Sequence, residues 1–314
     1  MDRADERSSG YDEAVSLPGS IVVILNTSAG STAAQPRRAE ELGELFRSAG
    51  TNADLVVLRP DQKPEQAARE ASTRASIVVA GGGDGTVSGV AAGIIGSRAA
   101  LAVLPLGTLN HFAKDLHIPL ALREAVAVVA AGHIARVDVG RVNDRLFVNN
   151  SSIGIYPGIV EQREDLRDDG YRKWPAMAIA TVRIMRRYRG VAVTIDADGS
   201  QITRRTPFVF VGNNEYAIDG LRLGARTALD RGKLFVYLAP RSRVRDLPML
   251  LATALIGRAR QSGALEIVAA TDVTIDTRTP RGISVAVDGE VAIMRTPLRY
   301  RSHPAALAVV VPRV

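Results

Sequence analysis

The first 135 residues alternate short apolar runs with helical segments, and this alternation restricts the fold more than any other feature of the chain. The expected strands are nearly continuous runs of Val, Ile, Leu and Ala: Ile21–Leu25, Ala53–Leu58, Ser76–Ala80 and Leu101–Leu104. The expected helices place apolar residues at helical spacing: Glu40–Ser48, Glu65–Ala71, a segment after Thr86, and Leu120–Ala131. Strands of this kind suit a parallel sheet covered on both faces. We therefore predict an α/β domain, which binds ligands at the carboxyl ends of its strands.

From about Arg136 the pattern changes to many short strands, separated by turn signals such as Asp198-Gly199 and Asp288-Gly289. The expected strands are Val137–Val142, Phe147–Asn149, Val191–Ile195, Phe208–Val211, Leu234–Leu238, Leu265–Val268, Val273–Ile275, Ile283–Val287, Val291–Met294 and Leu307–Val311. Their apolar and polar alternation is typical of a β-sandwich. We predict a flexible tail at 1–19, an α/β domain at 20–135, and a β-rich domain at 136–314 whose last segment can return to the first domain.

Composition excludes several classes of protein. With no cysteine, the chain has no disulfide, no thiolate metal site and no cysteine nucleophile. Its longest uncharged apolar run, Leu247–Ile256, is about half the roughly 20 residues that a membrane-spanning helix needs. The tail carries a net charge of −3 and lacks the apolar segment of a signal peptide, so we expect a cytoplasmic protein.

The rest of the chain is basic. Removing the tail's −3 from the net charge of +7 leaves +10, which should attract polyanions. Aromatic residues make up only 4% of the chain and do not alternate with basic ones, so we expect no nucleic-acid partner. Two helical segments with basic flanks, 174–188 and 241–260, fit either helices packed on the sandwich or helices lying on an anionic membrane surface.

A glycine motif gives the strongest indication of function. The run Gly81-Gly82-Gly83-Asp84-Gly85-Thr86 directly follows an expected strand and precedes an expected helix. Such a turn lets several backbone N–H groups point at one anion, and Thr86 can cap the helix. A carboxylate beside phosphates repels them unless a divalent cation lies between, so Asp84 indicates a Mg²⁺-nucleotide site in which it reaches the metal through water. The alternative is a plain tight turn.

Two other phosphate-binding loops do not match this chain. The Rossmann fingerprint needs a glycine at position 86 or 88, where Thr86 and Ser88 stand. The P-loop needs Ser or Thr after its lysine, but the Gly232-Lys233 pair is followed by Leu234. The glycine motif therefore belongs to a different kind of nucleotide site.

Two further polar loops follow neighbouring strands. One contains Gly107-Thr108-Leu109-Asn110, and the other begins at Asn26, directly after the first strand. Because the carboxyl ends of parallel strands meet at one edge of a sheet, we expect both loops and the glycine motif to face a single crevice. Three such loops indicate a ligand more strongly than one loop does.

These motifs together resemble the diacylglycerol kinase catalytic-domain superfamily, which includes bacterial lipid kinases and sphingosine kinases, over most of residues 20–314. The matching residues are Gly82–Thr86 for Gly-Gly-Asp-Gly-Thr, Gly107, Thr108 and Asn110 for Gly-Thr-x-Asn, Asp138-Val139-Gly140 for Asp-x-Gly, and Asp288-Gly289-Glu290 for Asp-Gly-Glu. The resemblance implies a nucleotide-binding α/β domain and a lipid-substrate sandwich that enclose a cleft.

The resemblance also implies roles for single residues. Those expected to bind Mg²⁺-ATP are Asn26, Gly82, Gly83, Asp84, Gly85, Thr86, Gly107, Thr108 and Asn110. Glu290 takes the role of the base that deprotonates a lipid hydroxyl, and Asp138 is a second candidate catalytic residue. From the residues alone, the Asp-Gly-Glu sequence suits an ordinary hairpin turn equally well, and Asp138 the beginning of a strand.

Three positions depart from the family's pattern. His111 stands where many members have Asp, and a histidine cannot replace a carboxylate in a Mg²⁺-water network. Ser88-Gly89 stands where Asn-Glu is frequent. Arg231 occupies the place of an aspartate that holds a further structural Mg²⁺ in some bacterial members, so we expect that site to be absent unless Asp230 replaces it.

We predict an ATP-dependent lipid kinase of lipid metabolism that acts on diacylglycerol or a sphingoid-type lipid at the inner face of the membrane, with a homodimer left open. An NAD kinase shares the glycine motif, but its acceptor site uses an Asn-Glu pair, which we expect this chain to lack downstream of the glycine motif. A third interpretation is a non-catalytic nucleotide-binding or lipid-binding relative of such kinases, which the three departures would favour.

Overall fold

The computed structural model describes residues 20–26, 35–155, 157, 190–218, 224–239, 265–277, 279 and 282–313. Several sequence predictions lie outside these ranges: the tail 1–19, loop residues 27–30, and the helical segments 174–188 and 241–260. Within the described ranges, no helix combines the length and the apolar character that crossing a membrane requires.

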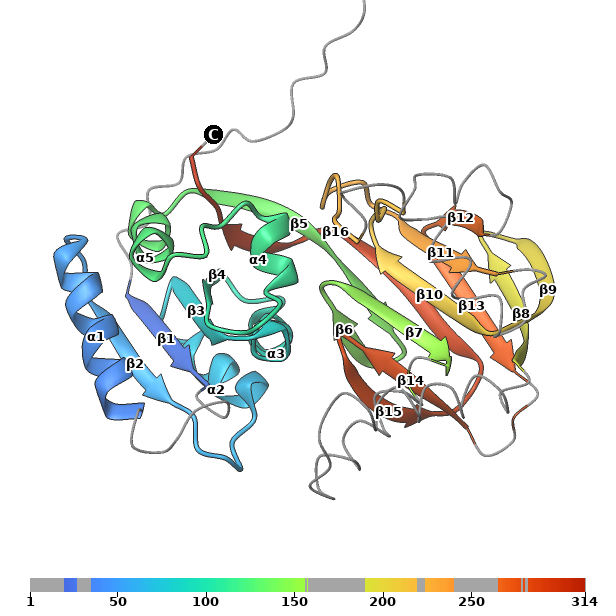
Figure 1. Ribbon diagram of the computed structural model, residues 1–314, viewed down its shortest axis with the longest axis horizontal. Helices are drawn as coiled ribbons and strands as arrows, with labels where there is room; N and C mark the ends of the chain where they lie inside the picture. The colour runs from blue at the N-terminus through green and yellow to red at the C-terminus, as the bar shows by residue number, and fades with distance from the viewer. Residues whose placement is uncertain are drawn as a thin grey trace, which may run out of the picture.

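The first domain is built on four parallel strands in the order β2-β1-β3-β4 (Figure 1). These strands are β1 (Ile21–Leu25), β2 (Ala53–Val57), β3 (Ile77–Gly82) and β4 (Ala100–Pro105). The helices are α1 (Gln35–Ser48), α2 (Pro64–Ala71), α3 (Asp84–Ile94), the short α4 (His111–Asp115) and α5 (Leu122–Ala131). α1 packs beside α5, and α2 packs beside α3. β1, β3 and β4 are buried along their whole length, as expected for strands without polar residues.

The strand order reverses between β1 and β3. The chain passes outward from β1 to β2 and then returns across β1 to β3 and β4. In open α/β sheets, the crevice at such a reversal is where ligands bind, outside the carboxyl ends of the strands. Asn26 follows β1 directly and the glycine motif lies where β3 ends, so both flank this crevice.

Two long antiparallel strands, β5 (Ile134–Val142) and β16 (Leu298–Val310), run from the first domain into the second (Figure 1). Near its end β16 pairs in parallel with β4, at Val309 and Leu101, and near its beginning it pairs with a sandwich strand, β13 (Asp272–Thr277). The described residues therefore contain one ten-stranded sheet that continues through both domains. The sequence indicated only that the last segment can return to the first domain. It did not indicate a shared sheet, because each strand pairs with partners far away in the chain.

The second domain is a β-sandwich. Besides β13, its strands are β6 (Arg145–Phe147), β7 (Asn150–Gly154), β8 (Val191–Ala197), β9 (Ser200–Thr206), β10 (Phe208–Asn213), β11 (Leu234–Leu238), β12 (Glu266–Ala270), β14 (Ile283–Val287) and β15 (Glu290–Met294). Its second sheet has the order β12-β11-β10-β7-β14-β15. Side chains such as Ile195, Val211 and Tyr300 form an apolar core separate from that of the first domain. The predicted fold class, an α/β domain followed by a β-sandwich, is confirmed.

The expected strand Phe147–Asn149 is wrong. β6 ends at Phe147, and β7 begins at Asn150. The backbone N–H groups of Val148 and Asn149 donate to the Asp288 carboxylate and not to a neighbouring strand. β9 was not expected at all, because its sequence SQITRRT is exposed along most of its length and lacks an apolar face.

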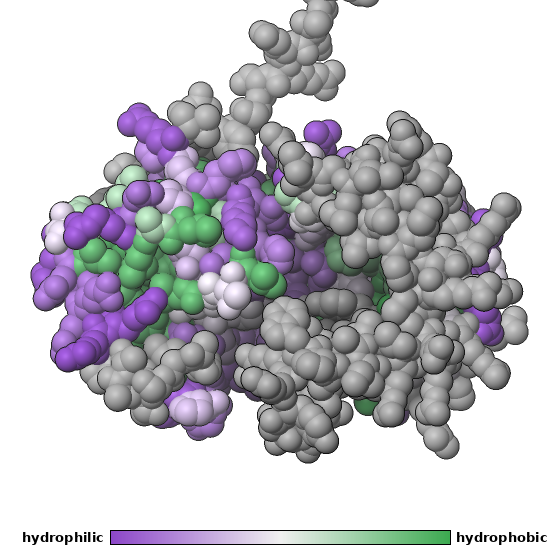
Figure 2. All heavy atoms as spheres, in the orientation of Figure 1, coloured by the Kyte–Doolittle hydropathy of each residue, from purple (hydrophilic) through white to green (hydrophobic). Residues whose placement is uncertain are grey.

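The distribution of hydrophilic and hydrophobic residues on the first domain is that expected for helices that cover a sheet. Figure 2 shows hydrophilic residues at its outer margin and hydrophobic residues nearer its centre. Two large apolar side chains, Leu109 and Leu120, are more than half exposed on the segments before and after α4.

Candidate functional site

The glycine motif forms a tight connection from β3 to α3. Gly82 is the last residue of β3, and Gly83 precedes the first turn of α3. A methyl group built on Gly82 would lie 2.4 Å from Thr86 Oγ1, so no side chain fits there. Thr86 Oγ1 also accepts a hydrogen bond of 3.0 Å from Asn26 Nδ2, which joins the ends of β1 and β3.

The loop after β4 lies directly against the glycine motif. The Leu106 N–H donates to the Gly82 carbonyl at 3.1 Å, and a methyl group on Gly107 would lie 2.4 Å from Gly83 Cα. Asn110 closes this loop in the left-handed conformation, with φ of 51°. Its Oδ1 accepts from the Gly107 N–H and its Nδ2 donates to the Gly107 carbonyl, so its amide group is used within the loop. Thr108, in contrast, is exposed.

Asp84 begins α3 and is half-buried. Its carboxylate accepts one hydrogen bond, of 3.3 Å, from the Phe112 N–H of α4, which leaves acceptor capacity on both oxygens. The described residues contain no group of three or more His, Asp or Glu able to enclose a metal ion. A single carboxylate beside a glycine turn suits Mg²⁺, which keeps most of its waters and shares ligands with phosphates. The residues present therefore fit a Mg²⁺-nucleotide.

Glu290 comes from the second domain and lies beside the glycine motif. It is the exposed first residue of β15, and its Oε1 is 3.8 Å from a methyl group built on Gly85. Both residues line a cleft of about 710 Å³ between α2 and α3 on one side and β6 and the turn before β15 on the other. Basic and acidic side chains line this cleft in equal number among the described residues: Lys63, Arg69, Arg141 and Arg145, and Glu65, Asp144, Asp288 and Glu290.

Asp288, two residues before Glu290, fixes this turn to two other segments. Its Oδ1 accepts from the Asn149 and Asn150 N–H groups, each at 2.9 Å. Its Oδ2 accepts from the Val148 N–H at 2.8 Å and from the Ser88 hydroxyl of α3. Burial raises the pKa of Asp288 above its usual range, and these four hydrogen bonds oppose that rise. Ser88, which stands where the family often has the Asn of an Asn-Glu pair, thus connects α3 to the turn that bears Glu290.

Asp138 lies apart from these residues. Its buried carboxylate accepts from the Ala305 N–H at 2.8 Å, from the Gly232 N–H at 2.6 Å, and from Asn214 Nδ2 at 3.1 Å. These contacts join β5 to the loop before β11 and to the bulge in β16. No contact of Asp138 with the glycine motif or with Glu290 is present among the described residues, so its catalytic role stays a prediction.

The two remaining departures are exposed. His111 begins α4, and Arg231 lies in the loop before β11, where its backbone N–H donates to Asn214 Oδ1 at 2.9 Å. That loop is thus fixed to Asn214 and, through Gly232, to Asp138 by direct protein contacts. The expectation about a structural metal at this place stays a prediction.

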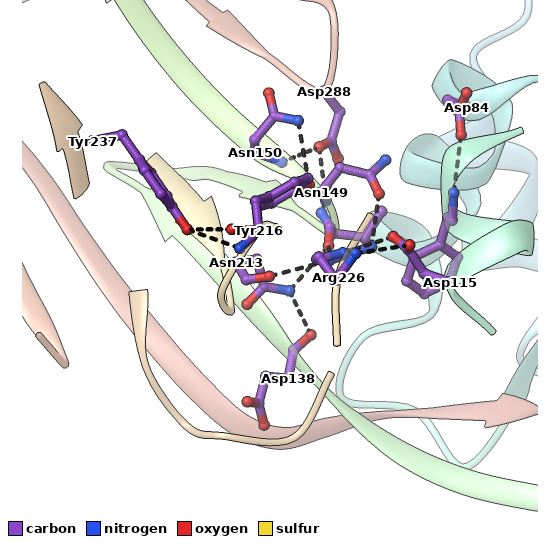
Figure 3. A network of polar contacts seen from close by, with 12 residues as sticks. Asp84, Asp115, Asp138, Asn149, Asn150, Asn213, Tyr216, Arg226, Tyr237 and Asp288 are labelled. Carbon is purple, nitrogen blue, oxygen red and sulfur yellow. Dashed lines mark hydrogen bonds and ion pairs between the residues drawn. The ribbon is translucent and has the colours of Figure 1, made fainter. Parts of the chain in front are cut away.

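A buried arginine that the sequence did not single out joins the two domains (Figure 3). The Arg226 side chain is completely buried, and its Nε donates to Asp115 Oδ2 of α4 at 2.7 Å. On the sandwich side it donates to the Val148 and Asn213 carbonyls and to Asn149 Oδ1. No local pattern marks Arg226, because all these partners are distant in sequence.

The expectation that no Asn-Glu pair lies downstream of the glycine motif is wrong, because one occurs late in the chain, at Asn214-Glu215. Asn214 is fully buried, and its amide contacts Asp138 and Arg231. Two consecutive asparagines at the end of the apolar strand β10 were a usable signal for a polar cluster there.

Comparison with known proteins agrees with this architecture. Residues 20–142 match the family model described as "Diacylglycerol kinase catalytic domain", and residues 167–311 match the one described as "YegS C-terminal NAD kinase beta sandwich-like domain". A diacylglycerol kinase of Staphylococcus aureus is 26% identical over 216 residues, which are 68% of each chain. One of Staphylococcus saprophyticus is 38% identical over 91 residues, 28% of this chain and 30% of that relative.

The fold is also found among solved structures. A crystal structure of a diacylglycerol kinase from Bacillus anthracis str. Sterne superposes with a TM-score of 0.69 at 19% identity. The superposition covers 93% of this chain and 97% of the other. This likeness extends over both domains.

Proposed function

The chain belongs to the diacylglycerol kinase catalytic-domain superfamily, and on that premise we propose that it transfers the γ-phosphoryl group of ATP to the hydroxyl of a lipid. The observation that carries this proposal is the position of Glu290, a carboxylate from the sandwich that lies beside Gly85 of the glycine motif and lines the same cleft. A carboxylate and a phosphate-binding turn from different domains thus meet where an acceptor could enter.

The first domain supplies the nucleotide side of the proposed reaction. The first turn of α3 presents N–H groups that have no partner within the helix, and Gly85 leaves space in front of them. The close approach of Gly83 and Gly107 places the exposed Thr108 loop beside this turn. Asn26 and Asn110 support the two loops through contacts with Thr86 and Gly107. We propose that ATP phosphates bind against these loops.

Asp84 is the residue that would hold Mg²⁺, through water and together with the nucleotide. The metal would offset charge on the transferred group when bound. The Phe112 N–H orients the Asp84 carboxylate without using all of its acceptor sites. His111, next to Phe112, is exposed and adds no carboxylate to this group.

Glu290 is the proposed general base. It would accept the proton of the lipid hydroxyl as that oxygen bonds to the γ-phosphorus and the bond to the bridging oxygen of ADP breaks. The turn before it is fixed by Asp288, so the carboxylate position is defined by contacts to α3 and to the β6–β7 loop. Lys63, Arg141 and Arg145 line the cleft, and we propose that they contact phosphate groups there.

The acceptor is proposed to be diacylglycerol or a sphingoid-type lipid alcohol, met at the inner surface of the membrane. The excess of basic residues supports attraction to anionic lipid. The two basic-flanked segments that could lie on a membrane, 174–188 and 241–260, are outside the described residues. The proposal that the protein binds the membrane surface is therefore supported by the net positive charge of the chain.

A soluble acceptor is the second candidate. The sandwich matches a model whose description names an NAD kinase-like sandwich, and the chain has the pair Asn214-Glu215. Burial of Asn214 against Asp138 argues against its use for a dinucleotide, because its amide already has protein partners. Phosphorylation of NAD is therefore an alternative outcome of the test.

The test is transfer of labelled γ-phosphate from Mg²⁺-ATP to a total lipid extract, with NAD as a separate acceptor. We expect a labelled lipid with the parent protein and none with Asp84→Ala. Asp54→Ala, which removes an exposed carboxylate from the same domain, is the matched control and should keep full transfer. Label in NADP would support the second candidate. ATP binding without transfer to either acceptor would indicate a binding protein and contradict the kinase proposal.

A further inference from the structure

Arg226 carries a buried positive charge that contacts residues of both domains. Its guanidinium lies 5.7 Å from the centre of the Phe112 ring and 5.5 Å from that of Tyr216, so it is excluded from water between two aromatic rings. A buried charge is tolerated only when it is paired and its remaining donors are satisfied. Here Asp115 supplies the opposite charge, and three further acceptors complete the set.

Asp115 and its neighbours connect Arg226 to the proposed nucleotide site. Asp115 accepts both the Arg226 side chain and its backbone N–H, at 2.7 and 3.2 Å. It is the last residue of α4, a helix of five residues. Phe112 of the same helix packs on the guanidinium and donates its N–H to Asp84. Arg226 is therefore linked to the Asp84 carboxylate through the single short helix α4.

On the other side, Arg226 is connected to the turn that bears Glu290. The carbonyl of Val148 accepts from Arg226 at 2.6 Å, while the N–H of the same residue donates to Asp288. Asn149 repeats this pattern, with its side-chain oxygen bound to Arg226 and its N–H bound to Asp288. Asn149 of the β6–β7 loop thus contacts Arg226 on one side and Asp288, two residues before Glu290, on the other (Figure 3).

We propose that Arg226 is a positioning residue that sets the separation between Asp84 and Glu290, and hence between bound nucleotide and acceptor hydroxyl; this inference rests on the proposed kinase function. Only a guanidinium can satisfy Asp115, the two carbonyls and Asn149 at once, because its donors lie in a fixed planar fork. A lysine at 226 keeps the charge but cannot reach all four acceptors.

The first measurement is the kcat and KM of Arg226→Lys with Mg²⁺-ATP and the lipid acceptor. We expect kcat to fall by about 100-fold, because misplacement of reacting groups by about 1 Å has an effect of that size. The KM for ATP should change little, since Arg226 does not line the nucleotide loops. Arg74→Met is the matched control: it breaks an Arg–Asp pair of the same 2.7 Å length that is exposed, and it should leave both constants unchanged.

The second measurement reports position without depending on activity. Because the chain has no cysteine, nitroxide labels can be attached at Glu70→Cys on α2 and Ile293→Cys on β15, both exposed, on the two sides of the cleft. Pulsed electron spin resonance should give a narrow distance distribution in the parent and in Arg74→Met. We expect a shifted or broadened distribution in Arg226→Lys and in the milder variant Asn149→Ala, which removes a single acceptor.

Two outcomes overturn the proposal. One is a folded Arg226→Lys protein whose kcat and distance distribution both match the parent. If Arg226→Lys does not fold, the other is a folded Asn149→Ala protein with unchanged kcat and unchanged distances. A parent protein without any transfer activity would contradict the kinase function alone, because the distance measurement still decides whether Arg226 fixes the two sides of the cleft.

Discussion

Two sets of polar contacts differ in how far apart in sequence their partners lie. One set is in the nucleotide loops, which follow β1, β3 and β4, and the other is in the joint between the domains, formed by Arg226, Asp288 and their partners. Asn110 bonds to groups three and five residues away, within one loop. Asp288 bonds to groups about 140 residues away, and Arg226 pairs with Asp115 across 111 residues. The contacts inside the Asn110 loop are encoded by neighbours in sequence, and the Asn26–Thr86 contact spans 60 residues but stays within the first domain. The contacts of Asp288 and Arg226 exist only after both domains have folded against each other.

This difference has a functional consequence. The loops that follow β1, β3 and β4 contact one another without the sandwich, so we expect the proposed phosphate site to form within the first domain. Glu290 reaches that site only through the sandwich, and its position depends on Asp288, Ser88 and Arg226. Changes in the loops should therefore alter nucleotide affinity, and changes in the joint should alter turnover and stability.

The largest effect on stability is expected at Asp138, which joins β5 to the loop before β11 and to the bulge in β16. Asp138→Asn replaces an acceptor oxygen by an NH₂ group that faces the buried N–H groups of Gly232 or Ala305. We expect the free energy of unfolding to fall by about 3 kcal/mol, the size of a lost hydrogen bond to a buried charge. Urea unfolding measures it.

Asp276→Asn, at an exposed position of β13, is the control and should change the free energy of unfolding by less than about 0.5 kcal/mol. Equal stability of the two variants would contradict the structural role of Asp138. A stable Asp138→Asn protein without phosphoryl transfer would instead favour the catalytic role predicted from the sequence.

A smaller effect is expected in the loops, at Gly107. A methyl group there would lie 2.4 Å from Gly83 Cα, a backbone atom that cannot move aside without shifting the glycine motif. Gly107→Ala should lower the free energy of unfolding by about 2 kcal/mol and weaken ATP binding by at least about tenfold. Calorimetric titration with Mg²⁺-ATP and urea unfolding check the two parts.

Gly43→Ala in α1 is the matched control, because its nearest neighbours are flexible side-chain atoms at 3.6 and 3.7 Å. Alanine favours a helix over glycine, so this variant should be more stable by up to about 1 kcal/mol and should bind ATP like the parent. Unchanged ATP affinity in Gly107→Ala would show that the contact between the two loops does not shape the nucleotide site.

The Ser88–Asp288 hydrogen bond joins α3 of the first domain to the turn that bears Glu290. Its loss should lower both the free energy of unfolding and kcat, by less than the changes above. Ser88→Ala removes one of four hydrogen bonds to Asp288, with an expected loss of about 1 kcal/mol in stability. Because this bond connects α3 to the Glu290 turn, kcat should fall several-fold while ATP affinity is kept. Ser200→Ala, which removes a hydroxyl at an exposed position of β9, should change neither quantity. A drop in ATP affinity without a drop in kcat would place Ser88 in the nucleotide site.

The smallest effect is expected at Asp198, far from both regions. Hydrogen bonds from the Asp272 and Thr271 N–H groups lower the pKa of this exposed carboxyl below its usual 3.8. A lowered pKa means that the charged form contributes stability above about pH 4, and that this contribution is lost as the pH falls through the folded-state pKa. Asp198→Asn, which tolerates the same left-handed backbone, should be less stable by under about 1 kcal/mol at pH 7.

Urea unfolding at several pH values tests this prediction. The difference in stability between the parent and Asp198→Asn should be constant from about pH 8 to 5 and should close below about pH 4. A difference that is independent of pH would show that the charge at 198 is not responsible.

Much of the first domain could be predicted because its signals are local. Apolar runs marked β1, β3 and β4, and the placement of glycines showed where the chain turns at the ends of β3 and β4. The structure confirms the fold class and brings Asn26, the glycine motif and the Gly107 loop together. Glu290 was found through its resemblance to a family motif, since its own neighbourhood suits a simple hairpin.

The joint could not be predicted in the same way. Arg226 lies in an irregular segment, and nothing near it in sequence indicates that Asp115 is its partner. The expected strand at Phe147–Asn149 failed for the same reason, because the Asp288 carboxylate takes the N–H groups that a strand would have used. Ser88, which departs from the family's pattern, donates to Asp288 of the second domain, 200 residues away in sequence.

The central claim is that Glu290 from the sandwich acts at the nucleotide loops of the first domain. The most direct test is the kcat of Glu290→Gln with Mg²⁺-ATP and the lipid that accepts label, beside the control Glu266→Gln in β12. We predict that kcat falls by about 10²- to 10⁴-fold in Glu290→Gln alone, with ATP affinity and folding unchanged. A Glu290→Gln protein that keeps kcat within about threefold of the parent would contradict the claim.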